Sequence, residues 1–350
     1  MNHTMQIGKR TISAASPTFI VAEVSANHNQ NYDRAVEIIH AAAEAGADAV
    51  KLQTYTADTL TIDCHDDCFM NKGGLWDGIS EYDLYKQAYT PWEWQPKLIE
   101  EAHKLGMECF SSPFDFTAVD FLEELNVPAY KIASYEINDI PLIRKVAKLH
   151  KPVIFATGIA YPEDIERAFA VCKEEGNEDV ILLKCVSAYP TPYEEVNLNV
   201  IPTLAKTYDC LTGISDHTLG TIVSAGAVPL GAKMVEKHLT LRRADGGPDS
   251  GFSMEPQEFK QMVDSIRNVE KALGKVSYEL SDKMKANREF SRSLFAVKDI
   301  KKGEIITKDN VKSIRPGFGL HPKYLAEIIG CKAAEDIDRG TPFKLEFVNK

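Results

Sequence analysis

The segment CLTGISDHTLGTIVSAGAVPLGAKMVEKHLT, residues 210–240, contains the pattern that decides the fold. It contains two short apolar runs, residues 210–217 and 233–240. The first ends at His217, and the second ends two residues after His238. Short apolar runs bounded by polar residues are typical of buried β-strands. The two histidines can act together only if the scaffold brings the ends of both strands to the same place. The arrangement of the remaining strands therefore decides what these histidines can do.

The same pattern repeats from residue 19 onward, where short β-branched runs end in polar residues and amphipathic helical stretches lie between them. The eight predicted strands are FIVAEVSAN (19–27), DAVKLQTY (48–55), MECFSSPF (107–114), AYKIASYE (129–136), PVIFATG (152–158), VILLKCVSAYP (180–190), CLTGISDH (210–217) and KMVEKHLT (233–240). The predicted helices include YDRAVEIIHAAAEAG (32–46), WEWQPKLIEEAHKLG (92–106), FTAVDFLEELN (116–126), DIPLIRKVAKLH (139–150) and PEDIERAFAVCKEEG (162–176). Several of them end in glycine, the usual residue just past a helix. Strands that alternate with helices indicate parallel βαβ units.

Eight such units over about 260 residues predict a (β/α)8 TIM barrel. A doubly wound sheet is the competing interpretation, and it more often has a glycine-rich phosphate turn after its first strand. The segment AEVSANHNQN (22–31) contains no glycine at that point. The α/β class with a closed TIM barrel is therefore the prediction.

The domain organisation follows from where this repeat is interrupted and where it stops. Between the second strand and the next helix, residues 56–91 form an insertion longer than ordinary loops, which we interpret as a lid over the barrel. The repeat ends with PQEFKQMVDSIRNVEKALG (256–274), so we assign residues 1–277 to the barrel and 278–290 to a charged, polar linker. Residues 291–350 show short strands separated by glycine turns and are predicted to form a small β-rich domain.

Composition narrows the classes of function. The formal net charge of −11 argues against nucleic acid as a partner, because phosphate neutralisation needs a basic face. The sequence shows neither an N-terminal signal peptide nor an apolar run of about 18 residues, so we predict no membrane segment. The odd number of scattered cysteines fits reduced thiols, and we therefore predict a cytoplasmic protein. The cluster CHDDC (64–68) lacks the second ligand pair of a structural zinc site, and a solvated loop is the better interpretation.

In a TIM barrel the active site lies at the C-terminal ends of the strands. The polar residues predicted there are Glu23, Asn27, His28, Lys51, Gln53, Ser111, Ser112, Lys131, Ser134, Glu136, Thr157, Lys184, Ser187, Tyr189, Ser215, Asp216, His217, Glu236, Lys237 and His238. His217 and His238 end neighbouring strands, and neutral imidazoles are common metal ligands, so the pair predicts a catalytic metal site. The alternative is that each histidine caps its strand through a bond to a backbone carbonyl.

Lysines inside parallel strands carry a second signal. Lys51 and Lys131 are costly to bury unless each meets an anion. Together with the nearby serines Ser112, Ser134 and Ser215, they predict a pocket for a phosphate or carboxylate. The alternative is that the lysines form structural salt bridges with Glu23 and Glu136.

The motifs AEVSANHNQN, DAVKLQT, FSSPFD, YKIASYE, ISDHT, EKHLT and DGGPDSGFSMEP resemble, in this order, those of the bacterial sialic acid synthase family. The last 60 residues, with RSLFAVKDIKKGEIIT and IRPGFG, resemble the antifreeze-like (SAF, β-clip) domain of that family. Within the family the sequence is most similar to the pseudaminic acid synthases, on the segments GLWDG, YTPWEW and DGGPDS.

The resemblance implies a C–C bond-forming transferase. It would condense phosphoenolpyruvate with an open-chain N-acetylated hexose, here 2,4-diacetamido-2,4,6-trideoxy-altrose, and water to give a nine-carbon 2-keto acid and phosphate. A divalent metal, Mn²⁺ or alternatively Mg²⁺ or Co²⁺, would polarise the aldehyde. The resemblance further implies a homodimer in which the SAF domain covers the partner's barrel.

The resemblance also assigns roles to individual residues. His217 and His238 would hold the metal, and Glu23 would act beside it as acid or base. Phosphoenolpyruvate would be bound by Lys51, Lys131, Ser112, Ser134, Ser187 and Ser215. The sugar would be oriented by Gln53, Glu136, Tyr189 and Asp249, with Arg315 contacting its N-acetyl group across the dimer. Ser187 and Ala156 stand where family members often have asparagine and serine, so the resemblance does not define the precise anchoring at the phosphoenolpyruvate end.

Other functions remain as alternatives. A relative that uses another N-acetylated hexose, an N-acetylneuraminate or legionaminate synthase, would share the same motifs. A metal-dependent barrel hydrolase would also place histidines at strand ends, but it usually carries a His-x-His pair on the first strand, where this chain offers only His28. A non-catalytic ice- or carbohydrate-binding protein is suggested by the C-terminal domain alone.

Overall fold

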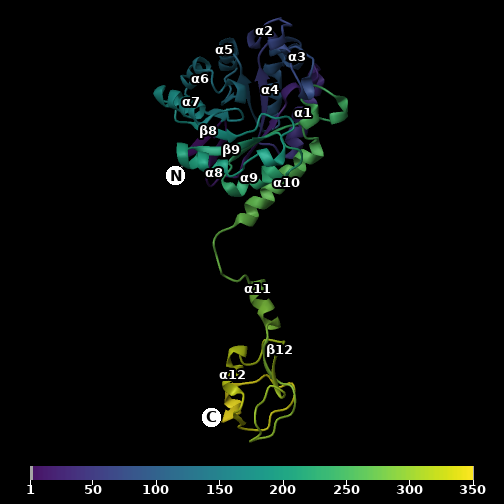
Figure 1. Cartoon of the computed structure of the whole chain (residues 1–350), viewed down its shortest axis with the longest axis vertical. Helices are drawn as coiled ribbons and strands as arrows, with labels where there is room; N and C mark the ends of the chain where they lie inside the picture. The colour runs from purple at the N-terminus through teal and green to yellow at the C-terminus, as the bar shows by residue number, and fades with distance from the viewer. Residues whose placement is uncertain (1–2, 350) are drawn as a thin grey trace. The chain divides into compact units, whose positions relative to one another are not determined.

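The computed structural model describes residues 3–349 (Figure 1). The chain divides into two compact units, Met1–Gly274 and Lys275–Lys350. Each unit has its own hydrophobic core, and the two are described separately.

The first unit is a closed barrel of eight parallel strands, in the order β10-β3-β4-β5-β6-β7-β8-β9. The strands are β3 (Phe19–Glu23), β4 (Ala49–Thr54), β5 (Glu108–Pro113), β6 (Tyr130–Ile132), β7 (Val153–Ala156), β8 (Val180–Lys184), β9 (Leu211–Asp216) and β10 (Met234–His238). Closure occurs where β10 pairs with β3, with His238 in register with Glu23. The predicted (β/α)8 barrel is confirmed.

Helices surround the barrel on the outside (Figure 1). They are α1 (Tyr32–Ala45), α4 (Gln95–Lys104), α5 (Phe116–Glu124), α6 (Ile140–Ala147), α7 (Pro162–Glu174), α8 (Val200–Tyr208), α9 (Ile222–Ala227) and α10 (Pro256–Leu273). Helix α1 illustrates how the sequence sets their ends. The Asn31 side chain accepts a hydrogen bond from Arg34 N at the start, and Gly46 ends the helix at φ 91°, which favours glycine.

Alternation along the strands separates two cores. Residues such as Ile20, Val50 and Val235 point outward and pack against the helices, whereas Val21 and Met234 fill the barrel interior. Because the side-chain period of a strand is two, the next inward positions after the apolar layer bring a layer of polar side chains to the C-terminal ends. This layer contains Glu23, Lys51, Ser112, Lys131, Ser215 and Glu236, all buried.

An N-terminal hairpin, β1 (Thr4–Ile7) with β2 (Arg10–Ser13), was not among the predicted elements. Its apolar residues Met5, Ile7 and Ile12 belong to the same buried cluster as the barrel interior. The hairpin therefore packs against the apolar floor of the barrel, at the N-terminal ends of the strands.

The insertion at residues 56–91 contains two helices, α2 (Ala57–Leu60) and α3 (Glu81–Ala88), joined by irregular segments. Trp76 Nε1 donates a hydrogen bond to Pro248 O at 2.9 Å, which ties the insertion to the loop after β10. Cys64 and Cys68 are free thiols. Cys64 is half-buried and residues 65–68 of the CHDDC cluster are exposed, as expected of a surface loop.

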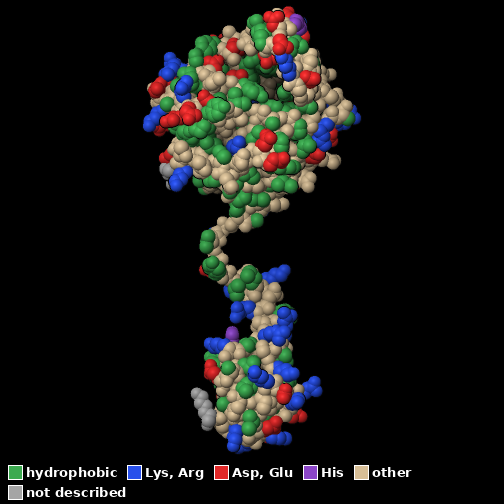
Figure 2. Space-filling model, viewed as in Figure 1, with side chains coloured by type: hydrophobic (Ala, Val, Ile, Leu, Met, Phe, Trp, Pro, Cys, Tyr) green, Lys and Arg blue, Asp and Glu red, His purple; other side chains and the backbone are tan. Residues whose placement is uncertain are grey.

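The second unit contains α11 (Asp282–Asn287), β11 (Ser293–Ala296), β12 (Val311–Ile314), α12 (Leu325–Ile328), β13 (Lys332–Ala333) and β14 (Val348–Asn349). Leu294, Ile306, Val311 and Phe343 lie in its small core. Residues 275–350 include 16 Lys and Arg but 11 Asp and Glu, whereas residues 1–274 include 24 and 40. Figure 2 shows many basic side chains on the surface of this unit.

Among residues 3–349, no helix is both long and apolar enough to cross a membrane.

Candidate active site

Four buried charges form the centre of the polar layer at the strand ends. Lys51 Nζ lies 2.5 Å from Glu23 Oε2 and 3.7 Å from Glu236 Oε1. Lys131 Nζ lies 3.8 Å from Glu236 Oε1. The salt-bridge alternative is thus realised in part, because Lys51 pairs closely with Glu23.

Lys131 is different, because its ammonium group has few partners. The residue is 2% exposed, and its Nζ donates one hydrogen bond, to Ile132 O at 3.4 Å. An ammonium group carries three donors, and burying them without acceptors is unfavourable. Within the described part of the chain, Lys131 therefore has spare donors that an anion in the barrel could accept.

The two carboxylates in this cluster differ in their affinity for protons. Burial raises the pKa of Glu23, and Lys51 opposes this only in part. For Glu236, burial also disfavours the charged form, but Lys131 and Lys51 together hold its pKa below the usual value. Glu236 is consequently the ionised partner of the lysines, and Glu23 is the carboxyl group suited to exchange a proton.

His217 and His238 meet above this cluster, with ring centroids 5.3 Å apart. Burial lowers the pKa of His217 to about 4 and that of His238 well below its usual value, so both rings are neutral. His217 Nδ1 lies 3.1 Å from Val186 O, whereas His238 Nδ1 is buried without a hydrogen-bond partner in the described structure. Neutral rings with a free buried nitrogen match what a divalent metal requires of its ligands.

A cavity of about 510 Å³ opens beside His238. Its lining combines strand-end residues with residues of the insertion: Gln53, Tyr55, Ser134, Glu136, Tyr189, His238, Asp249 and Phe252 with Leu60, Asn71, Trp76, Glu81, Leu84, Tyr85 and Ala88. The insertion therefore forms part of the wall of this cavity, as a lid would. Glu136 Oε2 is buried there without a hydrogen-bond partner among residues 3–349, and burial raises its pKa to about 7.

The serines predicted to bind an anion lie around the lysines. Lys51 Nζ donates to Ser112 Oγ at 3.3 Å, and Ser215 Oγ donates to Glu236 Oε1 at 3.1 Å. Ser187 Oγ donates to Ser134 Oγ at 2.8 Å. Gly158 packs against this last pair, because a Cβ there would lie 2.2 Å from Ser187 Oγ. The structure thus places these four serines in hydrogen bonds with Lys51, with Glu236 or with one another at the strand ends.

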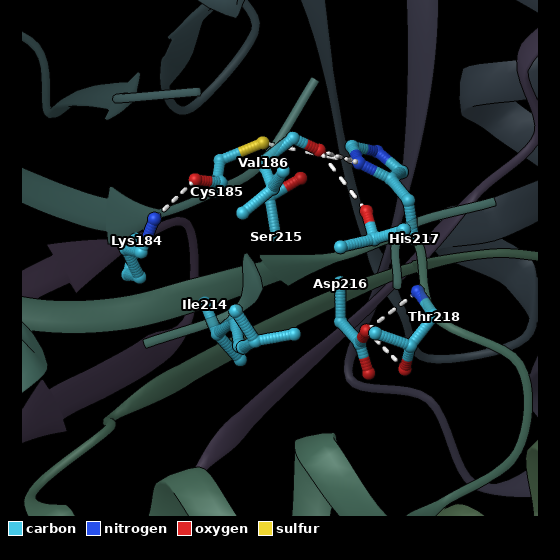
Figure 3. Close-up of a pocket in the computed structure, with 10 residues that line it drawn as sticks. Lys184, Cys185, Val186, Ile214, Ser215, Asp216, His217 and Thr218 are labelled. Atoms are coloured by element: carbon cyan, nitrogen blue, oxygen red, sulfur yellow. Dashed lines mark hydrogen bonds between the residues drawn. The ribbon is translucent and has the colours of Figure 1, made fainter. Parts of the chain in front are cut away.

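Strand alternation excludes two strand-end candidates, Asp216 and Lys237, from the cavity. Asp216 and His217 are adjacent in sequence, but Figure 3 shows their side chains pointing apart. Asp216 instead pairs with Lys237 at 2.9 Å, outside the barrel interior.

The sequence prediction omitted Cys185, whose Sγ lies 3.9 Å from His217 Nδ1, although its inward position follows from the alternation along β8. His28 Nε2 contacts Thr90 Oγ1 at 3.2 Å, and no contact joins it to His217 or His238 among residues 3–349.

Arg315 belongs to the second unit. It is exposed, and within the described structure its guanidinium makes no hydrogen bond or ion pair. Its predicted role at the sugar is therefore a proposal about a second copy of the chain.

Comparison with known proteins identifies the family. The NeuB family pattern matches residues 38–278, and the SAF domain pattern matches residues 291–348. The chain belongs to the NeuB family. The resemblance found from the motifs is confirmed, including the SAF domain at the C-terminal end.

Members of the NeuB family with curated names are similar over nearly the whole chain. The pseudaminic acid synthase of Campylobacter jejuni strain 81-176 is 47% identical over 97% of this chain and 98% of its own length. The pseudaminic acid synthase of Helicobacter pylori is 45% identical over 95% and 98%. A crystal structure of N-acetylneuraminic acid synthetase from Leptospira borgpetersenii has 31% identity and a TM-score of 0.73, covering 82% of this chain and 95% of that one.

Proposed function

We propose that the protein is a pseudaminic acid synthase. It condenses phosphoenolpyruvate with open-chain 2,4-diacetamido-2,4,6-trideoxy-altrose and water, and it releases phosphate. The sequence identity of 45–47% to pseudaminic acid synthases supports this choice of acceptor sugar over those of other family members. The observation that carries the proposal is the under-satisfied ammonium of Lys131 beneath a cavity lined by polar and aromatic side chains.

Phosphoenolpyruvate carries a phosphate and a carboxylate, and the barrel offers two lysines and several hydroxyl groups for them. Lys131 has free donors for the substrate anion. Lys51 would exchange its contact with Glu23 for a contact with the substrate anion. Ser112, Ser134, Ser187 and Ser215 supply neutral donors around the same volume. Charge-assisted hydrogen bonds in a closed site of this kind bind anions tightly and fix their orientation.

The reaction joins C3 of phosphoenolpyruvate to the aldehyde carbon, adds the oxygen of water to C2 and breaks the bond between C2 and the phosphate oxygen. The water loses both of its protons: one goes to the aldehyde oxygen, which becomes a hydroxyl group, and the other leaves with the phosphate as C2 becomes the keto carbon. Glu23, whose pKa burial raises, is the group that exchanges these protons. Gln53, Glu136, Tyr189 and Asp249 line the cavity and orient the sugar hydroxyl and acetamido groups.

A divalent metal fits the pair of neutral histidines, because His238 Nδ1 is buried and free of partners in the described structure. His217 and His238 would hold the ion, with Mn²⁺ as the proposed metal. When bound, it would polarise the aldehyde as a Lewis acid and leave open positions for water or substrate.

The test is a phosphate-release assay combined with mass spectrometry of the products. Phosphate release should require both phosphoenolpyruvate and the sugar. In a mixture of the diacetamido-trideoxy-altrose and N-acetylmannosamine, the product should carry the mass of pseudaminic acid. Release without any sugar would indicate a hydrolase, and a product from N-acetylmannosamine alone would assign a different acceptor.

We further propose a homodimer in which the SAF domain of one copy covers the barrel opening of its partner. Exposed apolar side chains follow four adjacent strands at that opening: Tyr135, Ile159, Tyr161, Tyr193, Leu219 and Ile222. The charges are complementary, because the barrel unit is acidic and the second unit is basic. The exposed Arg315 would then reach the N-acetyl group of the partner's sugar, where its fixed fork of donors suits an amide carbonyl.

Mixing two inactive variants tests this arrangement. Arg315→Ala should lose sugar affinity, and His217→Ala should lose turnover. After subunit exchange, one site of each mixed dimer combines an intact barrel with an intact Arg315, so part of the activity should return. Confirmed mixed dimers without any recovery would place Arg315 outside the partner's site.

A cytoplasmic location remains a prediction from the sequence.

A further inference from the structure

Ser25 adopts a backbone conformation that is unusual for a buried serine. It directly follows the end of β3 and has φ 49°, in the left-handed region. The other described non-glycine residues with positive φ are Asn29, Gln30, Asn126, His150, Asn197 and Asp209, and none of them is buried. Ser25 is 1% exposed. Glycine would adopt this conformation without steric cost, so the serine side chain is kept in spite of strain.

The contacts of Ser25 connect three strand ends. Its backbone N donates to Glu23 Oε1 at 3.0 Å, while the hydroxyl donates to Asp249 Oδ2 in the loop after β10. Gln53 Nε2, on β4, donates to both Ser25 Oγ and Glu23 Oε1, each at 3.2 Å. One small side chain thus joins the carboxylate of Glu23 to the sugar-binding side of the cavity.

The left-handed turn is what makes this network possible. Ser25 N points to Glu23, and the next backbone donor, Ala26 N, points to Asp249 Oδ2 at 3.3 Å. Glu23 Oε1 is held by the Ser25 N–H and by Gln53, which leaves Oε2 to Lys51. Glycine would keep both backbone contacts and would lose only the hydroxyl group.

We propose that Ser25 is a positioning residue for the reaction: its hydroxyl links Asp249 to Gln53, and this linkage fixes the orientation of the Glu23 carboxylate. The inference rests on the proposed synthase function, because it assigns Glu23 a role in proton exchange. It explains why a strained serine stands where glycine would relieve the backbone.

The test compares Ser25→Gly with Ser25→Ala. Glycine removes strain and hydroxyl together, whereas alanine removes only the hydroxyl. Ser25→Gly should therefore unfold at the same temperature as the wild type or higher, and above Ser25→Ala. In both variants kcat should fall by about 10- to 100-fold, the range for losing a hydrogen bond to a charged group, with KM for phosphoenolpyruvate changed less than about two-fold.

Two further variants separate this role from a structural one. Asn197→Gly, at an exposed left-handed residue outside the site, serves as the matched control and should keep wild-type kcat. In an Asp249→Asn background, Ser25→Gly should change kcat by less than about two-fold, because the linkage is already broken.

Wild-type kcat in Ser25→Gly would overturn the inference. It would also be overturned if the fold-loss in kcat of the Asp249→Asn, Ser25→Gly double variant equalled the product of the losses in the two single variants. A wild-type enzyme that releases no phosphate from phosphoenolpyruvate and the sugar would instead overturn the proposed function.

Discussion

Two buried lysine–carboxylate clusters lie on opposite faces of β9 and β10. On the outer face, Lys237 pairs with Asp216 at 2.9 Å. The Asp216 carboxylate also accepts hydrogen bonds from Thr218 N, Thr218 Oγ1 and Ser224 Oγ, and Lys237 Nζ donates to Thr218 O. On the inner face, Glu236 stands between Lys51 and Lys131 at 3.7 and 3.8 Å, and its Oε2 has no hydrogen-bond partner in the described structure.

The difference lies in completeness rather than in burial or residue type. A buried pair whose carboxylate oxygens all accept hydrogen bonds and whose ammonium group has two partners holds a fold together and leaves little to bind a ligand. A buried cluster with spare donors and acceptors is unfavourable by itself, and it is retained where a ligand completes it. Neighbouring residues of one short motif, Glu236 and Lys237, therefore serve different purposes.

Metal removal should give the largest effect, and it should act on the site at the inner face and not on the outer cluster. We expect excess chelator to abolish turnover, because His217 and His238 would lose the shared ion, while the melting temperature of the protein changes little. Added Mn²⁺ should restore phosphate release. Full activity in excess chelator would remove the metal from the mechanism.

Breaking the outer pair should act on the fold. Lys237→Met leaves Asp216 buried without its cation, and we expect the free energy of unfolding to fall by about 3–5 kcal/mol in urea denaturation. The double variant Asp216→Asn with Lys237→Met should lose less, because the unpaired charge is gone. A loss below about 1 kcal/mol in the single variant would erase the distinction between the clusters.

The corresponding change in the inner cluster should act on substrate binding. Lys131→Met should reduce kcat/KM for phosphoenolpyruvate by an amount equivalent to about 2–5 kcal/mol, and it should alter KM for the sugar far less. Lys51→Ala should act in the same direction. Because Lys131 has few partners in the protein, the free energy of unfolding should change by less than about 1 kcal/mol. An unchanged KM for phosphoenolpyruvate in both variants would make these lysines structural.

The smallest effect concerns Glu136, another incomplete group. Burial raises its pKa to about 7 from 4.5, so between these pH values the folded protein keeps a proton that the unfolded chain has released. This contribution lowers stability as pH rises through the window, and it is absent in Glu136→Gln. The variant should gain about 1–2 kcal/mol relative to wild type between about pH 5 and pH 8 in urea denaturation. The free energy of unfolding of the exposed control Glu194→Gln should follow that of the wild type at each pH. If the free energy of unfolding had the same slope against pH in all three proteins, the raised pKa of Glu136 would be contradicted.

The sequence predicted the barrel because strands and helices alternate with clear periods, and the fold then placed the polar strand ends together. It predicted that His217 and His238 face the same volume, and their ring centroids lie 5.3 Å apart. Asp216 and Lys237 were included among the strand-end candidates because a motif alone does not show where the inward face begins. That assignment depends on the apolar layer below it, which includes Val21 and Met234.

Other features could not be predicted because their signals are short or non-local. The strands β1 and β2 have four residues each, and their inward side chains become significant only against the barrel interior. The role of the left-handed turn at Ser25 is visible only in the contacts of its hydroxyl group with Gln53 and Asp249, residues far away in the sequence. Hydrogen-bond completeness, the property that separates the two clusters, appears only once the side chains are placed.

The hairpin β1–β2 packs against the apolar floor of the barrel interior, and this has a kinetic consequence for a two-substrate enzyme. The lysines that would bind phosphoenolpyruvate lie deeper than the cavity for the sugar, with the apolar layer of the barrel below them. A sugar bound in the cavity would block the path behind it. We therefore expect a compulsory order in which phosphoenolpyruvate binds first and inorganic phosphate departs last. Initial-rate measurements should accordingly show phosphate inhibiting competitively against phosphoenolpyruvate and not against the sugar.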